Sequence, residues 1–173
     1  MRPKKKTDAD SISKVELLDA LKEAHEQVQH MKNLIAEYKW LEGALRRRTR
    51  DLSERVKELD CLYAISIKLV SSNDSLQQIL VDVINIMPGG WQYPEATCVR
   101  LLLRGNEYCT SNFCETKLKQ TAFIRQGNNR IGVLEVYLLP SPVDDKYRPF
   151  LPQEKHLLDL IAIWIGLIIE YRK

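Results

Sequence analysis

The stretch that decides the fold is residues 17–63, LLDALKEAHEQVQHMKNLIAEYKWLEGALRRRTRDLSERVKELDCLY. Leu17 begins a series of residues spaced by seven, which occupy the d positions of a heptad, and the a positions follow four residues after each. All seven d positions and five of the seven a positions are apolar, the exceptions being Glu42 and Thr49. A pattern of this length is typical of a coiled coil. We predict a seam formed by Leu17, Leu21, Val28, Met31, Ile35, Tyr38, Leu45, Leu52, Val56, Leu59 and Tyr63.

The ends of this helix and its oligomeric state also follow from the pattern. Ser13 and Glu16 form a capping box, and no strong break follows before about Val70. β-Branched residues at several a positions, with leucine at several d positions, favour a parallel pair of helices. We therefore expect a disordered basic segment over residues 1–12, a coiled-coil dimerisation helix over 13–57 and a homodimer.

Composition excludes several classes of protein. The 173 residues are 45% hydrophobic and 28% charged with a net charge of +3, so a nucleic-acid partner is not expected. The N-terminus has no apolar segment typical of a signal peptide, and the most apolar stretch, residues 157–169, is too short to cross a membrane. The four cysteines have no recognised metal spacing. We expect a cytoplasmic protein with reduced thiols and with no membrane contact, metal or cofactor.

The second part of the chain alternates between helical and strand patterns. Ser71–Asp74 interrupts the long helix, and Asp74 with Gln77 is predicted to cap a second helix that carries an apolar stripe. Two predicted hairpins and a final helix follow: the strands are residues 97–103 with 107–111 and 121–125 with 131–139, and the helix is residues 153–172. This order predicts an α+β fold, in which a long N-terminal helix precedes an antiparallel sheet flanked by helices.

The final helix is apolar on most of its circumference. It therefore needs more than one packing partner. We expect it to contact Leu59, Leu62, Tyr63 and Ile67 of the long helix, or the same helix of a second subunit. Leu59, Leu62 and Tyr63 would then belong to both the seam and the domain core.

Residues 58–173 resemble the GAF domain, in particular the divergent GAF-like input domains of bacterial and archaeal sensor histidine kinases. The resemblance rests on the stretches ELDCLYAIS, WQYPEATCVRL, NFCETKLKQ, RIGVLEVYL and PFLPQEKHLLDLIA. It implies a sheet between terminal helices, a ligand cavity roofed by loops, and dimerisation through helices continuous with coiled coils. No kinase core follows the last helix in this sequence, so we expect a signal to leave through the N-terminal helix or a separate protein.

A candidate ligand pocket lies where this family places its cavity. Polar groups on the two hairpins and nearby aromatic side chains are typical of small-molecule binding. These residues are Trp91, Tyr93, Arg100, Tyr108, Asn112, Phe113, Lys119 and Gln120. The alternative is that the polar side chains simply cover the solvent face of a half-exposed sheet.

A second candidate surface lies in the middle of the long helix, where apolar residues outside the seam are followed by an arginine run. Its residues are Leu34, Trp40, Leu41, Arg46, Arg47, Arg48 and Arg50. Residues 34–45 are expected to contact a further helix or another protein. The arginines fit a solvated face paired with nearby acids, a docking patch for an acidic partner, or a nucleic-acid contact.

Three functions remain open from the sequence. The first is a non-enzymatic signalling or adaptor protein, in which a coiled-coil-dimerised GAF-like domain binds a small molecule or a protein partner and transmits through the N-terminal helix. The second is a structural or assembly protein, whose empty GAF-like module recruits a larger complex. The third is a thiol-dependent enzyme that would use one of the cysteines. Because the sequence offers no other catalytic residue, we expect that the protein is not an enzyme.

Overall fold

The structure is a computed structural model that describes residues 8–71, 74–140 and 150–172. The chain divides into two compact units, Met1–Arg50 and Asp51–Lys173. The predicted α+β class is confirmed, with a long N-terminal helix followed by a four-stranded antiparallel sheet and two further α-helices. None of the helices in the described segments is long and apolar enough to cross a membrane.

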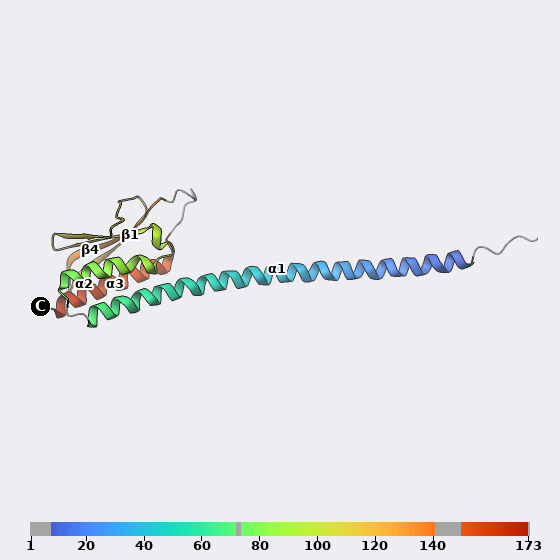
Figure 1. The fold of residues 1–173 in the computed structure, drawn as a ribbon, viewed down its shortest axis with the longest axis horizontal. Helices are drawn as coiled ribbons and strands as arrows, with labels where there is room; N and C mark the ends of the chain where they lie inside the picture. The colour runs from blue at the N-terminus through green and yellow to red at the C-terminus, as the bar shows by residue number, and fades with distance from the viewer. Residues whose placement is uncertain (1–7, 72–73, 141–149, 173) are drawn as a thin grey trace, which may run out of the picture. The chain divides into compact units, whose positions relative to one another are not determined.

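Helix α1 comprises Asp8–Ser71 (Figure 1). It begins five residues before the predicted start, so Ser13 lies inside the helix and the prediction that a Ser13–Glu16 capping box starts it is wrong. Residues 1–7 of the segment predicted to be disordered lie outside the described segments. The described part of the first unit, residues 8–50, consists of this helix alone, and every residue from Lys14 to Glu42 is exposed.

The second unit contains a sheet with the strand order β2-β1-β4-β3. Its strands are β1 (Thr97–Leu103), β2 (Asn106–Cys109), β3 (Lys119–Gln126) and β4 (Asn129–Leu138). Both predicted hairpins are present, with shifted ends. The first turns tightly at Arg104 and Gly105, whose positive φ angles of 49° and 84° suit a two-residue hairpin turn.

Helices cover one face of this sheet (Figure 1). They are α2 (Leu76–Ile86) and α3 (Pro152–Tyr171), and the short 3-10 helices η1 (Met87–Gly90) and η2 (Pro94–Ala96) connect α2 to β1. The N-cap of α2 is Ser75, whose side chain accepts a hydrogen bond from the Gln78 amide at 3.2 Å, and not the predicted Asp74. Ser75 stands directly before the first helical residue, the position from which a side chain reaches the free amides of the first turn.

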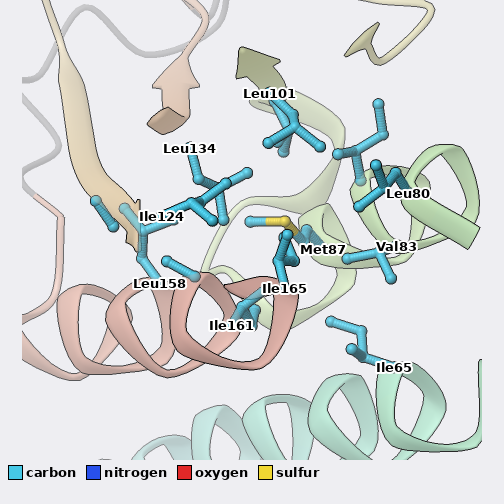
Figure 2. Packing of buried hydrophobic residues seen from close by; sticks show 14 of the residues in the cluster. Ile65, Leu80, Val83, Met87, Leu101, Ile124, Leu134, Leu158, Ile161 and Ile165 are labelled. Carbon is cyan, nitrogen blue, oxygen red and sulfur yellow. The ribbon is translucent and has the colours of Figure 1, made fainter. Parts of the chain in front are cut away.

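The core lies between the sheet and the helices (Figure 2). Alternate residues of the strands point toward the helices, as the period of two in a strand requires. They meet an apolar stripe on α2, one face of α3 and the side chain of Met87 in η1. Labelled members of this core are Ile65, Leu80, Val83, Met87, Leu101, Ile124, Leu134, Leu158, Ile161 and Ile165.

The last turns of α1 belong to this core through a different face from the predicted one. Cys61, Ile65 and Leu69 are buried there, spaced by four residues. The prediction that Leu59 and Tyr63 join the core is wrong, because they are 65% and 69% exposed, whereas Leu62 packs against the core as predicted. The helix therefore presents two apolar faces between residues 51 and 71, one packed and one open.

Candidate functional site on the long helix

The exposed face of α1 carries the predicted seam. In the first unit, seven large apolar side chains at a and d positions are 48–65% exposed: Leu17, Leu21, Val28, Met31, Ile35, Tyr38 and Leu45. Helical geometry places these residues on one stripe. A long apolar stripe open to water is typical of an interaction surface.

The same heptad continues along α1 in the second unit. Its a and d positions here are 55–69% exposed and are occupied by Leu52, Val56, Leu59 and Tyr63. Val70 occupies the a position after Tyr63, one residue before the end of α1. Burying one such side chain against a partner stabilises the complex by about 1 to 2 kcal/mol. The exposure of these side chains agrees with the helical period of the sequence and requires no tertiary contact; the dimer seam itself stays a prediction.

An apolar groove extends this exposed face onto α3. It has a volume of about 290 Å³ and lies between the C-terminal turns of α1 and α3. Leu167 and Tyr171 of α3 are exposed here. The excess of apolar residues around α3 indicated that this helix has a further apolar face. It did not indicate where the groove lies. Its lining residues are Ser66, Leu69, Val70, Trp164, Leu167, Ile168 and Tyr171.

The second predicted surface is also open to solvent. Leu34, Trp40 and Leu41 are 43%, 69% and 54% exposed. Arg46 donates a hydrogen bond to Glu42 at 2.7 Å, and this pair is exposed. Across the described segments, Arg47, Arg48 and Arg50 form no ion pair.

The predicted pocket residues do not converge on one site, because the sheet separates them. Arg100, Phe113 and Lys119 lie together on the face of the sheet opposite the helices. Trp91 and Tyr108 instead pack in or against the core, and Gln120 faces the same side as the buried Ala122. Tyr93 and Asn112 contact Thr97 at the start of β1.

The cluster around Arg100 is closed by its own contacts. Arg100 Nε donates to Glu135 Oε2 at 2.8 Å, and Arg100 Nη2 donates to the Tyr137 hydroxyl at 2.7 Å. Lys119 donates to the other Glu135 oxygen at 3.2 Å, and the Phe113 ring packs edge-on against Tyr137 with ring centroids 5.5 Å apart. These contacts join β1, β3 and β4, so the arrangement suits stabilisation of the sheet.

Two opposing effects set the pKa of Glu135. Burial raises this pKa, whereas hydrogen bonds from Tyr137, Arg100 and Lys119 lower it and prevail, so that it lies below its ordinary value. Burial, followed by the hydrogen bond to Glu135, raises the pKa of Tyr137. At neutral pH the cluster therefore contains an ionised carboxylate and a neutral phenol.

The cysteines are all free thiols. Burial raises the pKa of Cys61 to about 12, and burial also raises the pKa values of Cys98 and Cys109. A reactive thiol needs a lowered pKa, so these three side chains are poor nucleophiles at neutral pH. Within the described residues, no group of three or more histidine, cysteine, aspartate or glutamate side chains could hold a metal ion.

Comparison of the chain with protein-family models, with curated proteins and with solved structures finds no match.

Proposed function

We propose that this protein is a non-enzymatic signalling or adaptor protein that forms a parallel homodimer through α1. The observation that carries the proposal is the exposed apolar seam, which runs at heptad spacing along α1 in both units. A second copy of the same helix would cover this seam by packing its a and d residues between those of the first. The GAF-like module of residues 58–173 would be the part that receives a signal or a partner.

The two faces of α1 between residues 51 and 71 support this role. One face packs in the domain through Ile65 and Leu69, and the opposite face carries Leu59 and Tyr63 of the seam. A rotation or shift of the paired helices would therefore move the core-facing side chains of the same turns. This link replaces the predicted one, in which the same residues served both surfaces.

A structural or assembly role is the second candidate. It is favoured by the closed contacts of Arg100 and Lys119 and by the burial of Trp91, which leave these predicted pocket residues engaged within the domain. In that case the GAF-like module would be empty, and α1 would recruit a larger complex.

Native mass spectrometry of the full chain tests the dimer and separates the two candidates. We expect a species of twice 20.1 kDa. A retained small molecule would favour the sensory role, and a dimer without added mass would favour the structural role. A monomeric wild-type chain at micromolar concentration would refute both.

The seam assignment is tested by Leu45→Asp, with Trp40→Asp as the matched control. Both residues are exposed on α1, at 65% and 69%, but Leu45 is at a d position and Trp40 lies on the opposite side of the helix. Two buried aspartates at one seam position should weaken dimerisation by at least about 100-fold, measured by sedimentation equilibrium. Trp40→Asp should remain dimeric; equal effects of the two substitutions would contradict the assignment.

A further inference from the structure

A second surface on α1 stays uncovered by the dimer. We call it the Trp40 face, defined as Leu34, Trp40, Leu41, Ala44, Arg47 and Arg48. In the heptad these residues occupy f, g and c positions, so they lie beside and behind the seam. Helical spacing brings them onto one side over about four turns, with the apolar residues in the first turns and the arginines in the last.

The charge on and around this face is mainly positive. Residues 34–48 contain four lysines and arginines, Lys39 and Arg46 to Arg48, against two acids, Glu37 and Glu42. Glu42 pairs with Arg46, which leaves Arg47 and Arg48 without an ion pair among the residues that the structure describes. The Arg47 side chain lies along the helix, where a Cβ atom added at Gly43 would be 3.7 Å from Arg47 Nη1.

The proposed dimer turns this face into a groove. In a parallel pair, a g residue of one helix lies beside the e residue that is five positions later in the second copy. Leu34 would therefore face Lys39 of the second copy, and Leu41 would face Arg46 of the second copy. One wall of the groove is apolar; the other carries Lys39 and Arg46, the latter paired with Glu42 of its own helix. The two-fold symmetry produces two such grooves.

The apolar and cationic walls determine which kind of molecule can bind in the groove. A further copy of this segment would bring like charges together, which disfavours a dimer of dimers here. A nucleic acid would satisfy the arginines but would leave the leucines without an apolar partner. An amphipathic helix satisfies both walls when its apolar residues are spaced by three or four and its flanks are acidic.

We propose that the Trp40 face binds an acidic, amphipathic helix of a second protein, at two equivalent sites on the dimer. The inference rests on the proposed function, since the cationic wall comes from the second copy. The face extends over 15 residues, from Leu34 to Arg48. A partner helix of about four turns would cover it.

Site-specific photo-crosslinking of the full chain in its native host tests this proposal. The probe is p-benzoylphenylalanine in place of Glu37, which occupies the c position at the centre of the Trp40 face and is exposed. The matched control places the same probe at Glu23, which is also an exposed glutamate at a c position but has polar and small neighbours. The crosslinked peptides are then sequenced by mass spectrometry.

We expect an adduct from position 37 and none from position 23, with the crosslinked segment acidic and apolar at helical spacing. Combining Arg47→Glu with Arg48→Glu should lower its yield at least about tenfold, whereas Arg47→Lys with Arg48→Lys should retain it. The proposal is overturned by an adduct with nucleic acid, with another copy of the chain or with a basic segment. Equal yields at the two positions, or a yield insensitive to charge reversal, would also overturn it.

The oligomeric state is measured separately on the purified chain. A dimer that yields no specific adduct refutes the docking proposal and leaves the proposed function intact. A monomer refutes the proposed function and the groove between two copies; a charge-sensitive acidic adduct at position 37 would then assign the partner to the Trp40 face of a single chain.

Discussion

Glu135 lies on the face of the sheet opposite the helices, beside Arg100. It is a carboxylate in the middle of β4, only 6% exposed, and three side chains donate hydrogen bonds to it. Arg100 is the closest cation, with Nη2 2.6 Å from Glu135 Oε2. Removing one partner of a buried pair leaves the other charge uncompensated, which costs more than the pair contributes.

Glu135→Gln is therefore expected to lower the free energy of unfolding by about 2 kcal/mol at pH 7. The control is Glu107→Gln, because Glu107 also lies near Arg100 but is more than half exposed, with a separation of 3.8 Å. The control should change stability by less than about 0.5 kcal/mol. Urea denaturation measures both variants; equal effects would mean that Glu135 contributes no more than a surface carboxylate.

The difference between wild type and Glu135→Gln should depend on pH. The pKa of Glu135 is lowered in the folded state, so its stabilising effect is present above its unfolded pKa of about 4.3 and is lost as the pH falls through the folded value. Glutamine has no such titration. The difference between the unfolding free energies of the two proteins should therefore be largest at pH 7 and should decrease below about pH 4. A constant gap would contradict this assignment.

At the scale of the elements, the contact between α3 and β3 depends on Gly166. This glycine is buried in α3, and a Cβ atom there would lie far inside van der Waals contact with the Arg125 carbonyl oxygen of β3. A glycine inside a helix ordinarily costs about 1 kcal/mol relative to alanine. Here that cost permits the helix to approach the edge strand closely.

Gly166→Ala should consequently destabilise the domain by about 2 kcal/mol, although alanine is the better helix former. Gly89→Ala is the control, because nothing lies within 4 Å of the added Cβ atom and its φ is not positive. Thermal unfolding followed by circular dichroism should show a lower Tm for Gly166→Ala alone. An unchanged or higher Tm would show that α3 can move away from β3 at little cost.

At the scale of the whole molecule, the charges beside the seam favour one direction for the second helix of the proposed dimer. Lys32, Lys39 and Arg46 occupy successive e positions. In an antiparallel pair these e positions would face one another, whereas in a parallel pair Lys39 and Arg46 face leucines at g. Repulsion between like charges therefore adds to the preference of the seam for a parallel dimer.

A disulfide test distinguishes the two directions. In a background with Cys109→Ser and Cys114→Ser, which removes the two exposed thiols, Leu45→Cys should form a crosslinked dimer under mild oxidation. A d position of a parallel, in-register pair brings its two Cβ atoms close enough for this bond. Arg50→Cys, at an outward b position, is the control. Non-reducing electrophoresis measures the yield of crosslinked dimer. Equal yields from the two variants, or no crosslinked dimer from either, would contradict the parallel arrangement.

The candidate surfaces on α1 were predictable because they depend on local periodicity. The positions of Leu45 and Trp40 around the helix follow from their spacing alone, and both are exposed as that spacing indicates. The predicted pocket was not predictable in this way. Lys119 and Gln120 are adjacent in the sequence, but β3 directs them to opposite faces of the sheet, and only the strand register determines which face is packed.

By itself, the sequence determined the long helix, the exposed apolar stripe, the two hairpins and the α+β class, because each depends on short-range periods and turn residues. Only the tertiary structure decided that Cys61, Ile65 and Leu69 bury one face of α1 while Leu59 and Tyr63 stay open. It also decided that Arg100 pairs with Glu135 on the far side of the sheet. The physical reason is that several apolar faces competed for one core, and packing against α2, η1 and the sheet selected among them.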